Sequence, residues 1–227
     1  MLSKRLQAVL NLVGPCETAA DIGCDHGYLA IELIRKGIAK HVLATDINAG
    51  PLERAKEHIL SAGLQDRIET IRCDGMQGIY ADTVILAGMG GRLMHKILTD
   101  APKERSHTRE FVLQPQSDLA WFREQLCSLG LAIIAEDFVI EDEKYYPMMK
   151  VRKGSMQLTQ TEALYGPLLL KEKNELLESY LRQQSAYLQE LAESLQKQDS
   201  IKSRERLLTL EEERRLNREA LDLMKER

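Results

Sequence analysis

Three acidic residues follow strand-like segments early in the sequence, and the first of them stands in a glycine-containing loop. In residues 20–30, ADIGCDHGYLA, Asp21 ends an apolar run, and Gly23 and Gly27 precede a helical pattern. Such glycines let a nucleoside ligand approach the backbone at the carboxyl edge of a parallel sheet. A GxGxxG dinucleotide loop would need glycine at position 25, where Asp25 would repel a pyrophosphate. A cationic ligand without phosphate, such as S-adenosylmethionine, is favoured instead.

Two further acidic residues stand where the next strands should end. The segment ATDIN places Asp46 downstream of the glycine loop, where a carboxylate can bind the ribose hydroxyls of either NAD or S-adenosylmethionine. The segment CDGM places Asp74 within reach of an adenine amino group and Met76 against the ring, although Asp-Gly is also an ordinary turn. Three acidic loops after three successive strands together predict one nucleoside site.

A cluster of glycines follows the fourth predicted strand, in ILAGMGG. Gly88, Gly90 and Gly91 offer backbone amides and close approach to a reacting base, but glycines also relieve crowding where a strand turns into a helix. The sequence has no Asn-Pro-Pro-Tyr tetrapeptide, which holds exocyclic amines in many amino-group methyltransferases. Its absence argues against methylation of an amino group.

Alternating strand and helix patterns predict the elements that hold these loops. Strands are expected at 18–22, 41–47, 67–72, 83–87, 110–114, 131–139 and 145–151. Helices are expected at the N-terminus and at 28–36, 51–62, 92–99 and 118–128. Only residues 141–144 separate the last two strands, which is too short for a parallel crossover, so one of them should run antiparallel. The pattern resembles an α/β fold, a Rossmann-like class I methyltransferase sheet with one antiparallel strand.

The C-terminal part has a different pattern, because from Leu164 it is charged and free of strand signals. A heptad rhythm runs through Leu177, Leu181, Gln184, Leu188, Leu191 and Leu195, and a weaker one through Leu210, Arg214, Asn217, Leu221 and Met224. With a break near residues 199 and 200, this predicts an α-helical coiled-coil hairpin. We therefore expect two domains, residues 1–160 and residues 161–227. The arm fits either a structural or dimerising role or a role in gripping the substrate.

Composition sets limits on partners and location. A formal net charge of −4 gives no global nucleic-acid signature, so RNA binding would need a local basic patch. The four cysteines lie far apart without a CxxC pair, which argues against a disulfide framework or a zinc site and fits a reducing cytoplasm. We expect no metal. No apolar run approaches membrane length and no export signal is evident, so no membrane partner is expected.

Taken together, several motifs resemble one family. DIGCDHGYLAIELI, ATDIN, CDGM, LAGMGG and LQPQ, with LSKRL before them and EDEKYYPMMKV after them, are similar to the bacterial tRNA (adenine(22)-N(1))-methyltransferases of Gram-positive bacteria. The resemblance covers essentially the whole chain. It implies a class I fold, S-adenosyl-L-methionine as methyl donor and N1 of one tRNA adenine as acceptor. Gln116 departs from the asparagine that is common at this position in the family.

The expected site follows from these motifs. Cofactor contacts are expected from Asp21, Gly23, Cys24, Asp25, His26, Gly27, Tyr28, Asp46, Ile47, Asn48, Asp74, Gly75, Met76, Ala87, Gly88 and Met89. Substrate contacts are expected from Arg5, Gly90, Gly91, Arg92, Gln114, Pro115, Gln116 and Tyr146. Asp25 and His26 are the candidates for a catalytic role, although both fit cofactor binding alone.

Three other readings remain open. The chain would also fit a methyltransferase acting on another RNA position or a small molecule, a non-catalytic RNA-binding module, or an NAD-dependent dehydrogenase, which Asp25 disfavours. The expected partner is tRNA, with the protein a monomer or a weak dimer through the coiled coil.

Overall fold

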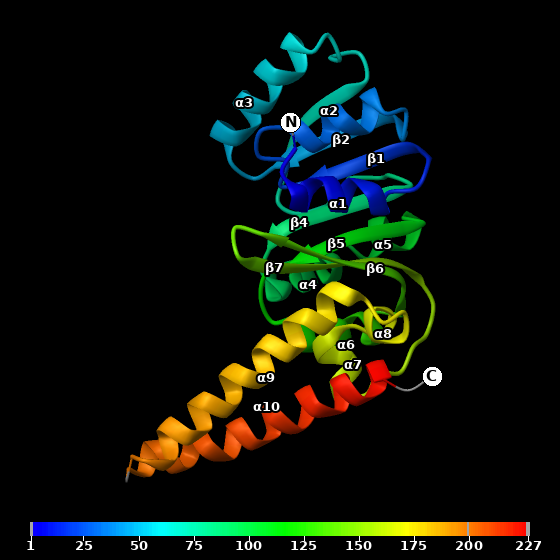
Figure 1. Ribbon diagram of the computed structural model, residues 1–227. Coiled ribbons are helices and arrows are strands. Elements are labelled where there is room, and N and C mark those ends of the chain that lie inside the picture. The colour runs from blue at the N-terminus through cyan, green and yellow to red at the C-terminus, as the bar shows by residue number, and fades with distance from the viewer. Residues whose placement is uncertain (1, 199, 226–227) are drawn as a thin grey trace. The chain divides into compact units, whose positions relative to one another are not determined.

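The computed structural model describes residues 2–198 and 200–225, and the chain divides into two compact units, Met1–Met156 and Gln157–Arg227 (Figure 1). The sequence placed the division at residue 160, whereas the compact units separate a few residues earlier, before the first helix of the second unit.

One seven-stranded sheet forms the centre of the first unit, in the order β3-β2-β1-β4-β5-β7-β6. Its strands are β1 Cys16–Ile22, β2 Ala39–Asp46, β3 Ile68–Arg72, β4 Thr83–Met89, β5 Glu110–Pro115, β6 Leu131–Glu141 and β7 Lys144–Lys153. The first five strands pair in parallel, and β7 runs antiparallel to both of its neighbours. The predicted reversal after the short 141–144 connection is therefore confirmed, with β7 as the reversed strand.

One helix precedes the first strand, and the other helices of this unit lie between strands. They are α1 Lys4–Leu12, α2 Tyr28–Arg35, α3 Ala49–Ser61, α4 Gly91–Asp100, α5 Pro102–His107 and α6 Leu119–Ser128. Apolar residues of α1, α2 and α3 pack with those of β1 and β2 in one core cluster. Helix α5 was not predicted, because it is six residues long and buries none of them, so it leaves no apolar period in the sequence.

Strand β5 lies inside the sheet, and all six of its residues are buried. This is expected of a strand that helices or loops cover on both faces. Glu110, at its start, is buried with its carboxylate 2.8 Å from Arg152 Nη2 and 3.2 Å from Lys150 Nζ, both on β7. The paired charges tie the antiparallel strand to the parallel part of the sheet.

The second unit is entirely helical over its described residues. Its helices are α7 Gln160–Tyr165, α8 Pro167–Lys171, α9 Glu175–Gln196 and α10 Ile201–Lys225. Helix α7 begins with a capping box, in which Thr159 and Glu162 satisfy each other's backbone amides. The short helices α7 and α8 were not predicted, since each spans less than two turns.

Helices α9 and α10 pack against each other as an antiparallel hairpin, as predicted (Figure 1). Leu188 and Ala192 of α9 pack on Leu210 of α10. Nearer the base of the hairpin, the Asn217 side-chain nitrogen donates to Leu181 O at 3.0 Å and to Gln184 Oε1 at 3.1 Å. The predicted break near residues 199 and 200 falls between α9 and α10, and residue 199 lies outside the described residues.

Candidate active site

One cavity of about 600 Å³ opens at the carboxyl ends of β1, β2 and β4, and we call it the main cavity. It is the place where doubly wound folds bind nucleotides. Its wall consists of Arg5, Leu6, Asp21, Ile22, Gly23, Cys24, Asp25, His26, Tyr28, Leu29, Thr45, Asp46, Ile47, Asn48, Cys73, Asp74, Gly75, Ala87, Gly88, Met89, Leu93, Ile97 and Gln116. The structure thus brings the three predicted acidic loops to one cavity.

Two carboxylates dominate the electrostatics of the main cavity. Asp21, at the end of β1, is 4% exposed, and burial, with a smaller contribution from the nearby charge of Asp46, raises its pKa to about 7. No basic side chain among the described residues pairs with Asp21. Asp46 ends β2 and accepts a hydrogen bond from Asn48 N at 2.8 Å, which fixes its position. A cation bound beside Asp21 would relieve the cost of its buried negative charge.

The glycine loop is held to the neighbouring strand by its backbone. Gly23 N and Cys24 N both donate to Thr45 O at 2.8 Å. Gly23 adopts φ 75°, and a β-carbon there would overlap the methyl group of Met89 across the cavity. Glycine at this position therefore keeps the floor of the main cavity open.

The predicted catalytic pair lies at the mouth of the main cavity. Asp25 has φ 48°, and its carboxylate lies 3.6 Å from Arg54 Nη2 and 3.6 Å from His26 Nε2. The Asp25 side chain is 66% exposed, so it reaches outward rather than into the pocket floor. By contrast, His26 Nδ1 is buried and has no hydrogen-bond partner among the described residues.

The carboxyl end of β4 forms another part of the wall and is fixed by the amide of Gln114. Gln114 Oε1 accepts from Gly88 N at 3.1 Å and from Arg5 Nη1 at 2.8 Å. Gly88 adopts φ 81°, and a β-carbon there would lie 3.3 Å from Arg5 Nη1 and 3.8 Å from Gln116 Nε2. The guanidinium of Arg5 also lies 5.8 Å from the centre of the Tyr146 ring. A residue of the N-terminal helix thereby becomes part of the cavity wall.

Eight predicted site residues do not line the main cavity. They are Gly27, Met76, Gly90, Gly91, Arg92, Gln114, Pro115 and Tyr146.

Two of the eight were expected to contact the cofactor. Met76 was expected to pack on an adenine ring. Its side chain is instead fully buried in the core, where it cannot reach a ligand in the main cavity. Gly27 precedes α2 in a left-handed conformation, with φ 71°, and serves as its N-cap.

The other six were expected to contact the substrate. Gln114 and Tyr146 do not line the cavity themselves but contact Arg5, which does. Pro115 is buried at the end of β5. Gly90 caps α4, and Gly91 packs against the Ser117 carbonyl and Phe122, so these glycines relieve crowding. Arg92 pairs with Asp118 at 2.9 Å and lies 4.6 Å from the centre of the Trp121 ring, away from the wall.

Several lining residues were not predicted, namely Leu6, Ile22, Leu29, Thr45, Cys73, Leu93 and Ile97. Most are apolar, and an apolar residue beside a loop carries the same sequence signal as a core residue. Thr45 and Cys73 directly precede Asp46 and Asp74, so their place in the ATDIN and CDGM motifs could have marked them as lining residues. Burial raises the pKa of the Cys73 thiol, which keeps it neutral.

Metal-binding clusters and membrane-spanning helices are both absent from the described residues. Residues 2–198 and 200–225 contain no group of three His, Cys, Asp or Glu side chains placed to hold a metal ion. Within the same residues no helix is long and apolar enough to cross a membrane.

The donor set of the main cavity fits S-adenosylmethionine. This ligand carries a sulfonium and an ammonium, which complement Asp21, whereas a pyrophosphate would be repelled by the carboxylates of the cavity wall. The orphaned His26 Nδ1 offers a further polar contact. With the sheet order and the reversed β7, these features define a class I methyltransferase.

Comparison with known proteins identifies the family. Residues 19–215 match the sequence model of the tRNA (adenine(22)-N(1))-methyltransferases, and the chain belongs to that family. The tRNA (adenine(22)-N(1))-methyltransferase of Bacillus subtilis strain 168 is 30% identical over 231 residues, which cover 97% of each chain.

Two solved structures match nearly the whole chain. The crystal structure of the B. subtilis m1A22 tRNA methyltransferase TrmK superposes with a TM-score of 0.85 at 29% identity, covering 97% of this chain and 99% of that one. The M. capricolum TrmK in complex with S-adenosyl-homocysteine, its cofactor product, has a TM-score of 0.85 at 26% identity, with 99% and 100% covered. The M. capricolum protein thus binds this cofactor product, and it matches the present chain over nearly its whole length.

Proposed function

We propose that the main cavity binds S-adenosylmethionine and that the chain transfers its methyl group to N1 of adenine 22 in tRNA. The observation that carries the proposal is the convergence of Asp21, Asp46 and Asp74, from the ends of three neighbouring parallel strands, on one cavity. The relatives named for this reaction match the chain over 97% of its length.

The cofactor contacts divide among the loops. Asp21 is placed to face the positive charges of the methionine part, and the Gly23 loop leaves room beside it. Asp46 is placed for the ribose hydroxyls, because it ends the second strand of the fold. Asp74 and the exposed Ile47 border the remaining space, where the adenine ring would lie.

The bound cofactor supplies an electrophilic methyl group on sulfur. N1 of neutral adenine carries a lone pair and no proton, so the protein needs to align the base rather than deprotonate it. Arg5 and Gln116 stand on the substrate side of the cavity and offer hydrogen bonds to the target nucleotide. Asp25 and His26 place negative charge and a polar edge at the mouth, where the adenine ring becomes cationic as its bond to the methyl group forms.

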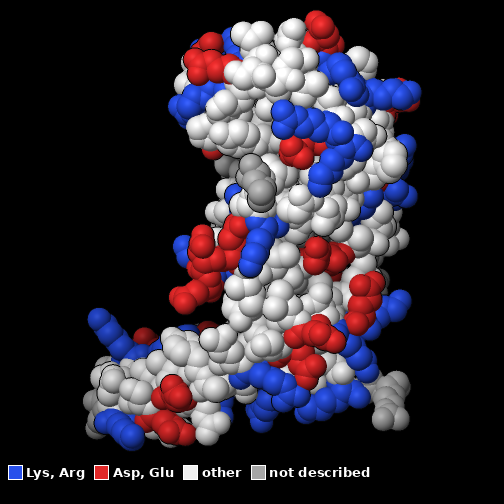
Figure 2. All heavy atoms as spheres, turned by 45° about the horizontal axis from the view of Figure 1, so that its top comes forward, with Lys and Arg blue, Asp and Glu red and all other residues white. Residues whose placement is uncertain are grey.

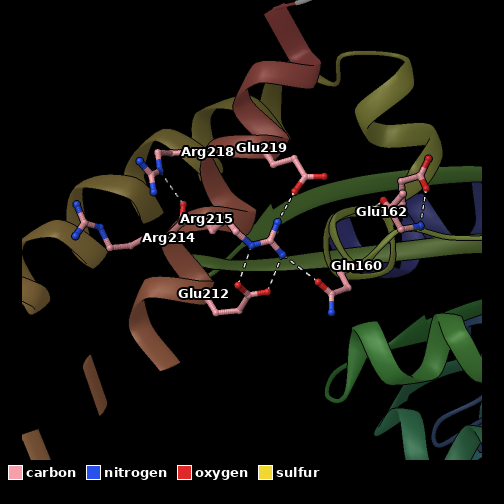
Figure 3. A network of polar contacts seen from close by, with 8 residues as sticks. Gln160, Glu162, Glu212, Arg214, Arg215, Arg218 and Glu219 are labelled. Carbon is pink, nitrogen blue, oxygen red and sulfur yellow. Dashed lines mark hydrogen bonds and ion pairs between the residues drawn. The ribbon is translucent and has the colours of Figure 1, made fainter. Parts of the chain in front are cut away.

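The helical unit is proposed to bind the tRNA backbone through α10. In Figure 3, Arg215 is held by Glu212, Glu219 and Gln160, at 2.7 to 3.0 Å, whereas Arg214 and Arg218 project away from this network. Neither Arg214 nor Arg218 has a carboxylate partner among the described residues, so both remain available for phosphates. Figure 2 shows basic side chains along the lower edge of this unit, among acidic ones.

Two further expectations concern the state of the protein. We infer a monomer or a weak dimer, because the apolar seam of α9 is already covered by α10 within one chain. All four cysteines are free, consistent with the expected location in a reducing cytoplasm.

The direct test is incubation of the protein with labelled S-adenosylmethionine and unmodified tRNA, followed by nucleoside analysis and mapping of the labelled position. N1-methyladenosine at position 22 is expected. A different nucleoside, a different position or no transfer would overturn the proposal.

The variant Asp46→Ala tests the assignment of the ribose subsite. Loss of the charge-assisted contacts should weaken cofactor binding by roughly 1–3 kcal/mol, measured by calorimetry. Asp82→Ala is the matched control, because Asp82 lies at the amino-terminal edge of the sheet, where its carboxylate accepts from Glu17 N and Thr18 N. Unchanged affinity in Asp46→Ala would remove this residue from the site.

A further inference from the structure

A cluster of three rings borders the mouth of the main cavity. Tyr28, the first residue of α2, stacks on His58 of α3 with ring centres 4.7 Å apart and planes inclined by 21°. His26 completes the cluster at 5.7 Å from both rings. Tyr28 is 49% exposed, so part of this preformed ring cluster is accessible from solvent.

The geometry of the cluster is fixed by hydrogen bonds. His58 Nδ1 lies 2.9 Å from His26 O, and since a carbonyl only accepts, this nitrogen carries the proton. His58 Nε2 then accepts from the Tyr28 hydroxyl at 3.5 Å when the imidazole is neutral. The α3 helix and the cofactor loop thereby hold the tyrosine ring in place, which lowers the entropic cost of stacking a ligand on it.

A second cavity of about 250 Å³ lies beside this cluster, and Tyr28 belongs to the walls of both cavities. The second cavity is lined by Leu2, Tyr28, Ile31, Glu32, Arg35, His58, Ser61 and Ala62. Its wall combines ring faces and aliphatic side chains with one carboxylate and one guanidinium, which lie 3.5 Å apart. A flat aromatic group with exocyclic amino hydrogens and a nearby phosphate would match this combination.

We propose that the Tyr28–His58 stack and the second cavity bind an unpaired nucleobase of the tRNA next to the target adenine. The inference rests on the proposed function, because it takes the substrate to be an RNA with a base displaced into the main cavity. Displacing one base from a folded RNA breaks its stacking with its neighbours, and an aromatic platform beside the site replaces that stacking. Glu32 is placed to accept from an exocyclic amino group and Arg35 to contact the adjoining phosphate.

The test uses three variants of the full-length protein. His58→Leu and Tyr28→Leu remove the two rings, and Tyr80→Leu is the matched control. Tyr80 has the same 49% exposure as Tyr28 and also contacts a histidine, His107, at 5.5 Å, but it is in neither cavity wall. The KM for tRNA should rise about tenfold in the two platform variants, the scale of one lost base stack, and should remain unchanged in Tyr80→Leu.

Two additional measurements separate this inference from other causes. Calorimetric S-adenosylmethionine affinity of His58→Leu should equal that of the wild type, which shows that the main cavity is intact. A tRNA carrying 2-aminopurine beside the target adenine should lose fluorescence on binding the wild type and Tyr80→Leu, but not the platform variants. Equal KM values and equal quenching in all proteins would overturn the inference. Wild-type protein that forms no N1-methyladenosine would instead overturn the proposed function.

Discussion

One buried polar side chain in each unit, Asp21 and Asn217, differs in how far the protein satisfies it. In the Rossmann-like unit, Asp21 is buried with no cationic partner among the described residues, and its raised pKa records the cost. In the helical unit, Asn217 is also buried, but its two amide hydrogens are accepted by Leu181 O and Gln184 Oε1, and only its Oδ1 has no hydrogen-bond partner among the described residues. A buried donor whose hydrogen bonds the protein supplies supports the fold, whereas a buried charge without a counter-charge favours binding of a cation beside it.

The largest effect is expected from Asp21→Asn, which removes the unmet charge. S-adenosylmethionine affinity should fall about a hundredfold, because a charge-assisted contact to a buried carboxylate is lost. Without cofactor, the variant should melt at or above the wild-type temperature at pH 8, because the buried, desolvated charge and its smaller repulsion with Asp46 are both gone. Calorimetry and thermal unfolding measure the two effects. Wild-type cofactor affinity in this variant would contradict the assignment.

The opposite behaviour is expected from Asn217→Ala. Its loss removes the side-chain hydrogen bonds to Leu181 O and Gln184 Oε1, although Gln184 Oε1 still accepts from the Tyr165 hydroxyl at 2.9 Å. The free energy of unfolding of the helical unit should therefore fall by about 1–3 kcal/mol. Urea unfolding followed by circular dichroism measures this change. Gln189→Ala is the control, because Gln189 only bonds Glu193 on the exposed face of α9, and less than about 0.5 kcal/mol is expected. Equal stabilities would show that the buried amide is not a structural bond.

The stability of the Rossmann-like unit and its affinity for S-adenosylmethionine should both depend on pH through Asp21. The pKa of Asp21 is raised from 3.8 to about 7 in the unliganded fold, so this group destabilises the fold progressively as the pH rises between these values. A cation favours the ionised carboxylate, so S-adenosylmethionine affinity should be full above pH 7 and fall by up to about tenfold per unit below it. Titrations from pH 5.5 to 8.5 test this. In Asp21→Asn the slope should disappear, and a persistent slope would assign it to another group.

The smallest effect is expected on the surface of α10. The double variant Arg214→Gln/Arg218→Gln should raise the KM for tRNA about threefold to tenfold and make the salt dependence of binding shallower, as loss of phosphate contacts does. Arg182→Gln is the control, because Arg182 already pairs with Glu178 at 2.6 Å on α9. If both proteins behave alike, α10 does not contact the tRNA backbone through these residues.

The sequence predicted the fold where a local pattern carried the information. The alternation of strand and helix patterns predicted the sheet. The short 141–144 connection predicted that one of the last two strands is reversed, and the structure shows that this strand is β7. Helices α5 and α8 were not predicted, because they are too short to show a helical period of apolar residues. The heptads of α9 and α10 predicted the hairpin, since each turn of a packed helix repeats the same apolar spacing.

Prediction of the site was limited by contacts between distant residues. Asp21, Asp46 and Asp74 lie in the wall of one cavity. The sequence predicted this, because all three come at or after the ends of successive parallel strands. Arg92 was expected to contact the substrate, but it pairs with Asp118, 26 residues away, and nothing near Arg92 in the sequence signals that pair. The burial of Met76 likewise depends on how the chain packs after CDGM. Such outcomes follow from tertiary packing, which a local pattern does not contain.

The hydrogen bond between Arg5 and Gln114 joins residues 109 positions apart, and it has a consequence for synthesis. Chains emerge from the ribosome with the N-terminus first. The loops that carry Asp21, Asp46 and Asp74 are complete before Gln114 exists, so a growing chain can assemble its acidic loops while Arg5 has no anchor. The wall that Arg5 forms is completed only when β5 enters the sheet, so it depends on a strand that is synthesised after all three acidic loops.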